Sequence, residues 1–159
     1  MLGIDTFAWF KLITLYNDKW KELMLKFLTE YEVFITNEIK KEYQYRFPKY
    51  EHLLEKITIH PRRKSNTTYD TKIFDKADIT LLEYTELDNY VIITEDFAML
   101  GQGITKKRNI IQFGDLIALL YKEGFVNSKD FYQIIKKLRE MKNITKNKEK
   151  ELNTIRIKP

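Results

Sequence analysis

Apolar residues along the chain fall into two alternating patterns. Short runs of successive apolar residues, typical of strands that are covered on both faces, occur at residues 1–4, 32–35, 90–94 and 109–113. Between and after them, apolar residues recur at helical spacing over residues 6–16, 19–29, 36–47, 77–87, from 97 onward, 115–122 and 128–142. Strands that alternate with helices predict an α/β fold, in which a central parallel sheet is covered on both sides as a three-layer α/β/α sandwich.

Two stretches do not follow this alternation. In residues 48–75, "KITIH" (56–60) fits either an edge strand or the end of a helix, and "PRRKSNTTYDTK" (61–72) is typical of a mobile loop. Residues 143–159 are polar, and we expect them to form a basic, flexible tail with frayed ends. Within that tail "NTIRI" (153–157) could instead add an edge strand.

Length and composition favour a single folded domain, which we expect over residues 1–142. The chain has 159 residues, 43% of them hydrophobic and 14% aromatic, so it can build a real core. Its apolar runs are shorter than a membrane span, and its first residues lack the basic start of a secretory signal. With no cysteine, disulfides and thiolate metal sites are excluded. The default expectation is a cytoplasmic protein that does not bind membranes.

The charge balance points to a polyanionic partner. The formal net charge is +5, and the bases gather in residues 61–72 and 136–150. The acidic residues are therefore free to concentrate elsewhere in the chain.

Acidic residues stand where predicted strands and helices meet. Asp5 ends the first strand, Asp96 follows the strand at 90–94, and Asp78 opens a helix. Glu42 lies in the helix that follows the second strand. Ligands of such sheets bind outside the carboxyl ends of the strands, so we expect these carboxylates to gather there. Carboxylate oxygens are ligands that hard divalent cations prefer, which makes this edge a candidate metal site.

Each of these acids also has an ordinary structural explanation. Asp5 and Asp96 could cap the helices that follow them, and Asp78 could be a helix-start acid stabilised by the macrodipole. Glu38 and Glu42 lie one turn apart and could form a solvated helix face. The order of the acids along the chain separates these explanations better than any single position does.

That order resembles the PIN-domain ribonucleases. In that family an Asp followed by Thr or Ser ends the first strand, which matches Asp5 and Thr6. A Thr followed six residues later by Glu and a hydrophobic residue matches Thr36 and Glu42 in "ITNEIKKEY", with Glu38 as the poorer match.

The second half of the resemblance lies in two further motifs. "KADITLL" matches the family's Asp before a small-apolar helix with Asp78, and Asp75 is the weaker alternative. "IITEDFAML" matches the Thr-x-Asp element with Thr94 and Asp96. The resemblance covers residues 1–122, and the helices beyond are similar to those of some PIN-type toxin relatives. The long insertion between Thr36 and Asp78 departs from the shortest toxins and leaves the subgroup open.

The resemblance implies a metal-dependent ribonuclease. Its catalytic, metal-binding residues would be Asp5, Glu42, Asp78 and Asp96, holding Mg²⁺ or Mn²⁺, while Thr6 and Thr94 would orient the carboxylates. Because an acidic pocket repels a phosphodiester backbone, bases must rim it. The candidates for this RNA contact are Arg62, Arg63 and Lys64 in one loop, and Lys106, Lys107 and Arg108 in another; a plain solvated turn is the alternative for the second group.

Partners and setting follow from the same resemblance. RNA is the expected substrate, and the toxin of a VapC-type pair, neutralised by an antitoxin protein, is the favoured setting. A stand-alone RNA-processing nuclease is the second setting, and relatives often form homodimers. The main alternative function is a catalytically inactive PIN-like module that binds RNA or protein. A dehalogenase-type phosphatase is disfavoured because Phe7 stands where its second Asp is needed, and a receiver domain because "NIIQFGD" lacks its Lys.

Overall fold

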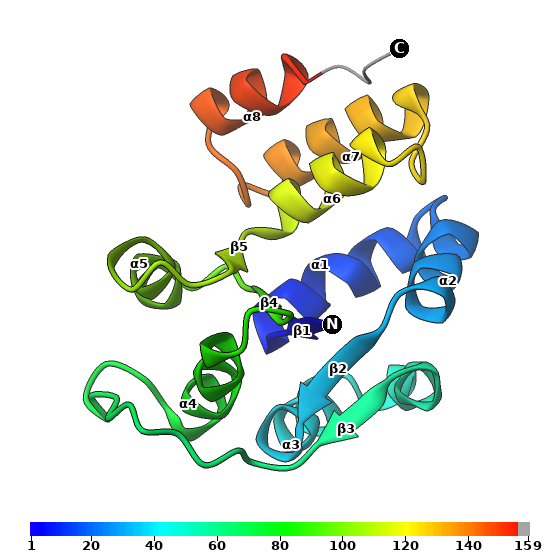
Figure 1. Cartoon of the computed structure of the whole chain (residues 1–159). Helices are drawn as coiled ribbons and strands as arrows, with labels where there is room; N and C mark the ends of the chain where they lie inside the picture. The colour runs from blue at the N-terminus through cyan, green and yellow to red at the C-terminus, as the bar shows by residue number, and fades with distance from the viewer. Residues whose placement is uncertain (156–159) are drawn as a thin grey trace. The chain divides into compact units, whose positions relative to one another are not determined.

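The computed structural model describes residues 1–155, which divide into two compact units (Figure 1). The first unit is residues 1–111, and the second begins at Gln112. Over the range 1–155, no helix is both long enough and apolar enough to cross a lipid bilayer.

The first unit is built on a five-stranded parallel sheet in the order β3-β2-β1-β4-β5. The strands are β1 (Leu2–Ile4), β2 (Val33–Thr36), β3 (Thr58–His60), β4 (Val91–Ile93) and β5 (Ile110–Ile111). The predicted α/β fold with a central parallel sheet is thus confirmed. Residues 56–60, which fitted either a strand or a helix end, supply the edge strand β3.

Right-handed crossovers assign the helices of this unit to the two faces of the sheet. The chain passes from β1 to β2 to β3 in one direction, which puts α1 (Thr6–Asn17), α2 (Lys21–Glu30) and α3 (Asn37–Arg46) on one face. It then passes to β4 and β5 in the opposite direction, which puts α4 (Lys76–Leu82) and α5 (Phe97–Thr105) on the other (Figure 1). Two 3₁₀ helices, η1 (Pro48–Lys56) and η2 (Glu83–Glu86), follow α3 and α4.

The segment expected to be a mobile loop has no helix or strand over residues 61–70, but it is anchored to the rest of the unit. The Tyr84 hydroxyl donates to the Pro61 carbonyl at 2.7 Å, and the Tyr69 hydroxyl donates to the Leu82 carbonyl at 3.1 Å. Because Tyr69 is buried, this segment contributes to the core of the unit.

The second unit is helical and corrects one expectation. It contains α6 (Phe113–Lys122), α7 (Ser128–Glu140) and α8 (Lys146–Asn153). Residues 143–159 were expected to be a frayed tail, but Lys146–Asn153 form a helix whose Leu152 is buried. The strand considered at 153–157 is absent at Thr154 and Ile155, and its remainder lies outside the described residues.

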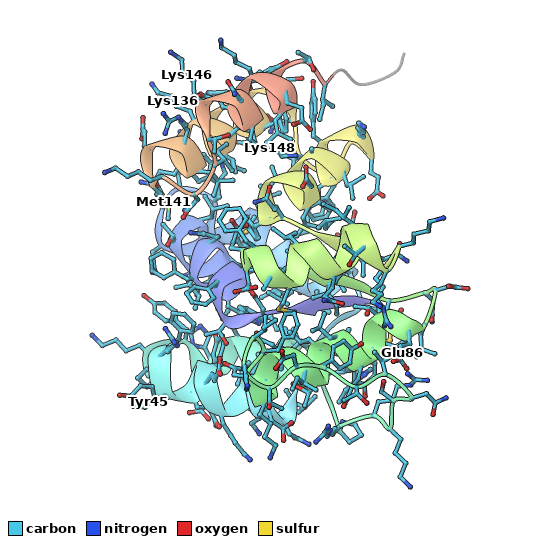
Figure 2. The ribbon with its side chains drawn as sticks, turned by 90° about the vertical axis from the view of Figure 1, so that its left-hand side faces the viewer. Tyr45, Glu86, Lys136, Met141, Lys146 and Lys148 are labelled. Atoms are coloured by element: carbon cyan, nitrogen blue, oxygen red, sulfur yellow. The ribbon has the colours of Figure 1, made fainter. Side chains whose placement is uncertain are left out.

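Contacts with the rest of the second unit explain why residues 146–153 are helical. The Thr145 hydroxyl caps α8 by accepting from the Lys148 amide, and the Lys148 ammonium lies 2.6 Å from an Asp115 carboxylate oxygen of α6. Ile144 and Leu152 are the apolar anchors, and a Cβ added at Gly114 would contact both. Lys136 and Lys146 project away from this small core (Figure 2).

Close packing across the central strand generates a paired prediction. A Cβ at Gly3 would lie 2.5 Å from Ile92 Cδ1 and 2.7 Å from the Phe34 ring, and both of those side chains are fully buried. We expect Gly3→Ala to lower the free energy of unfolding by about 1–3 kcal/mol, the usual effect of overpacking. Urea denaturation measures this change.

Gly101→Ala is the matched control, because a Cβ at Gly101 in α5 would meet no atom within 4 Å. It should raise the free energy of unfolding by about 0.5–1 kcal/mol through helix propensity. A Gly3→Ala protein as stable as the parent would contradict the packing argument.

Candidate active site

The candidate site lies where the strand order reverses. β1 and β4 are neighbours, but the chain leaves them in opposite directions, and ligands of open parallel sheets bind at such a switch point. Asp5 follows β1, and Thr94, Glu95 and Asp96 follow β4. The Asp5 amide donates to the Ile93 carbonyl at 3.1 Å, so the two strand ends are directly joined.

Asp5 is the most buried carboxylate of the site, with 2% of its surface exposed. Its Oδ1 accepts from the Ala8 amide at 2.6 Å, which caps α1, and its Oδ2 accepts from the Thr94 hydroxyl. Burial raises the pKa of Asp5 to about 7, although both hydrogen bonds act in the opposite direction. The folded protein therefore holds an acid that ionises near neutral pH.

Asp96 and Asp78 also lie at the start of helices. Asp96 caps α5 by accepting from the Met99 amide at 2.8 Å, and its own amide donates to the Thr94 hydroxyl at 3.0 Å. Asp78 and Asp75 form a capping box at the start of α4, with Asp75 as the N-cap. Partial burial, and then repulsion from Asp75, raise the pKa of Asp78 to about 6.

Glu42 and Glu38 have different partners. The Thr6 hydroxyl donates to Glu42 Oε2 at 2.5 Å, linking the first turn of α1 to α3. Glu38 instead lies 3.6 Å from the Lys76 ammonium, and its Oε2 is buried without a hydrogen-bond partner among the described residues. Thr6 thus contacts Glu42, the position that the sequence favoured over Glu38.

The predicted carboxylates are close enough for their charges to affect one another's pKa values. The charges of Asp96 and Glu42 both act on Asp78, and the charge of Asp78 acts on Asp5. Thr6 and Thr94, expected to orient carboxylates, donate to Glu42 and Asp5 respectively. Asp78 is therefore within electrostatic range of Asp5, Glu42 and Asp96, which the sequence placed on three other segments.

Lys11 is a charged neighbour that sequence reasoning missed. Lys11 is 8% exposed. Burial lowers the pKa of its ammonium group, while the negative charges of Glu95 and Asp5 act to raise that pKa. The signal was present in the sequence, because Lys11 lies on the same helical stripe as the buried Ala8 and Leu15. A cation on that stripe partly offsets the repulsion among the carboxylates.

The carboxylate oxygens of these residues are the donor type that a hard divalent cation prefers, but they do not form a closed cage around a single point. Over residues 1–155, no group of three or more His, Asp or Glu side chains is arranged so that it could hold a metal ion. An ionised carboxylate offers about four lone-pair sites, however, and the hydrogen bonds described above use only some of them. Mg²⁺ commonly binds through one or two carboxylates together with waters and substrate phosphates, so a full protein cage is not required.

The basic residues predicted to rim the site are largely engaged elsewhere. The Arg62 guanidinium lies 2.8 Å from the buried Glu83 carboxylate, and the Arg63 guanidinium lies 2.9 Å from that of Glu86. Arg108 donates to the hydroxyls of Thr85 and Thr67 at 2.9 and 3.2 Å, and its own side chain is 12% exposed. Lys64, Lys106 and Lys107 are exposed. RNA contact by these loops stays a prediction, with the arginines also serving the fold.

Comparisons of the chain with protein-family models, with curated proteins and with solved structures find no match. The arrangement of the site's own residues therefore carries the functional argument.

The buried carboxylate of Asp5 generates a prediction about stability. Its folded pKa of about 7 lies above the ordinary value of 3.8, so between these values the folded state binds more protons than the unfolded state. Stability therefore falls as the pH rises through this window. Asp5→Asn keeps an equally good N-cap and removes the ionisation. Without metal, we expect it to raise the melting temperature by several degrees at about pH 8 and by less at about pH 5.

Thermal melts in EDTA at both pH values measure this difference. Asp88→Asn, an exposed change at the amino end of β4, is the control and should leave the melting temperature unchanged. Equal destabilisation by Asp5→Asn at both pH values would show that Asp5 has only a structural role.

Proposed function

We propose that this protein is a PIN-type ribonuclease, which hydrolyses phosphodiester bonds in RNA with the help of Mg²⁺ or Mn²⁺. The observation that carries the proposal is the coupled group of Asp5, Glu42, Asp78 and Asp96 at the switch point of the sheet. Both raised pKa values there arise from burial and from neighbouring acids, and a shared cation would lower both by favouring the ionised carboxylates.

Helix capping alone does not account for the site. A cap needs one side-chain oxygen, and Ser, Thr or Asn supply it without charge. Asp5 uses one oxygen as a cap, while its second oxygen is buried against Thr94 at an ionisation cost that a neutral cap would avoid. A buried acid that destabilises the fold at neutral pH is better explained by function than by capping.

The residues divide the work of such a reaction. Asp5, Glu42, Asp78 and Asp96 would hold the cation, which when bound supplies an activated water and neutralises charge on the phosphate. The Thr94 hydroxyl donates to one oxygen of Asp5 and accepts a hydrogen bond from the Asp96 amide. The Thr6 hydroxyl donates to one oxygen of Glu42. These hydrogen bonds hold the carboxylates in place before substrate arrives.

Two further proposals concern setting and rank below the chemistry. The net charge of +5 suits an RNA substrate, or an acidic antitoxin in a VapC-type toxin pair. A stand-alone RNA-processing enzyme fits the same site. A PIN-like module without catalysis would explain RNA or protein binding, but it gives no reason to retain Asp5 at a cost in stability.

Cleavage of a labelled single-stranded RNA tests the proposal. We expect cutting with Mg²⁺ or Mn²⁺, none in EDTA, and a rate lowered at least about a hundredfold by Asp96→Asn, because loss of even an outer partner of a metal ligand commonly costs 10–100-fold. Asn retains the cap on α5, so the variant should fold.

Asp88→Asn again serves as the control, because it removes a carboxylate at the opposite end of β4 and should cut at the parental rate. Absence of cutting on several RNAs, together with absence of Mg²⁺ and Mn²⁺ binding by calorimetry, would exclude the nuclease and favour the binding module.

A further inference from the structure

Two phenylalanines beside the candidate site are exposed. Phe97 directly follows Asp96 and is 82% exposed, and Phe7 stands two residues after Asp5 and is 54% exposed. Other aromatic side chains are divided between the core, where Trp9 and Phe34 are 0% exposed, and the surface, where Tyr45 is 87% and Phe10 is 48% exposed. Single exposed apolar residues are common on proteins, so the position of these two carries the argument rather than their exposure alone.

Phe7 is paired with a cation. The Arg46 guanidinium lies over the Phe7 ring, 5.6 Å from its centroid. Arg46 is one helical turn after Glu42 on α3, about 6 Å along the axis, and Glu42 accepts from Thr6 next to Phe7. The described residues form no ion pair with Arg46, in contrast to Arg62 and Arg63. An aromatic ring and an available guanidinium thus lie one turn from a candidate metal ligand.

Phe97 begins the helix that covers the other face of the sheet. Phe7 is in the first turn of α1 and Phe97 opens α5, and the crossovers put these helices on opposite faces of the sheet. Asp5 and Asp96 cap the same two helices. A chain lying across this sheet edge would therefore pass one phenylalanine, then the carboxylates, then the other phenylalanine.

We propose that Phe7 with Arg46, and Phe97, bind unpaired bases of single-stranded RNA on the two sides of the scissile phosphate. This inference rests on the proposed function and assigns to it the residues that bind the bases of its substrate. Bases stack on aromatic side chains only when their faces are free, as in single strands, loops and bulges. Arg46 supplies the charge for an adjacent phosphate, which a purely apolar protein interface would not need.

Binding in EDTA tests this inference without any need for catalysis. Fluorescence anisotropy would compare a short unstructured RNA, an RNA duplex and an abasic ribose-phosphate oligomer on the parent, Phe7→Ala, Phe97→Ala and Arg46→Ala. We expect each phenylalanine change to weaken single-strand binding about tenfold and to leave abasic binding unchanged. Phe7→Trp and Phe97→Trp should restore it. Arg46→Ala should weaken both single-stranded ligands.

Exposed residues on the same helices supply the controls. Ile104→Ala on α5 and Lys41→Ala on α3 should bind the single strand more like the parent than the phenylalanine variants do. Ile104 lies near the end of α5 that is far from Asp96. Unchanged single-strand binding by both phenylalanine variants, or equal loss on the abasic oligomer, would overturn the proposal. So would a parent that binds only the duplex.

The outcomes also separate base stacking from cleavage, and an RNA-binding surface from a protein interface. RNA cleavage with unchanged binding in the phenylalanine variants would keep the nuclease and discard the stacking surface. Phenylalanine-dependent RNA binding without cleavage would discard the nuclease and keep the surface. If the phenylalanine changes convert a dimer to a monomer, seen by light scattering, while RNA binding persists, the surface is a protein interface and the proposal fails.

Discussion

The hydrogen bond from Thr94 to Asp5 joins the two halves of the candidate site. It crosses from the end of β4 to the end of β1, at the point where the strand order reverses. Asp5 in turn caps α1. The Thr94 hydroxyl accepts a hydrogen bond from the amide of Asp96, and the Asp96 side chain caps α5. One buried pair therefore sets the directions of two helices and the positions of two carboxylates, and movement of either strand would displace both.

This arrangement gives Asp5 a cost of ionisation that ordinary packing would avoid. Asp5 is nearly inaccessible, and two donated hydrogen bonds do not overcome the effect of burial on its pKa. Asp78 has a raised pKa for a related reason, with a second carboxylate one turn away. A cation at this edge would relieve both effects at once, so stability and ligand binding are expected to be linked.

Sequence patterns predicted the parts of the fold that depend on local spacing. The runs before Asp5 and Asp96 became β1 and β4, because continuous apolar residues suit strands covered on both faces. Helix α8 was missed because Leu152 is the one buried residue within Lys146–Asn153, which is too few for a periodic signal. The pairing of Arg62 with Glu83 was also missed, because partners 21 residues apart are set by the fold rather than by spacing.

The positively charged side chains of the first unit fall into three groups. One group pairs with the carboxylates of Glu83 and Glu86 and consists of Arg62, Arg63 and Arg108. These ion pairs attach the segment after β3 to η2. Lys11 lies buried within reach of the Asp5 and Glu95 charges, where it moderates repulsion without an exposed head group. Arg46 differs from both, because it is exposed and lies over an aromatic ring. A polyanion bound at this edge would therefore find in Arg46 a guanidinium that no carboxylate of residues 1–155 neutralises.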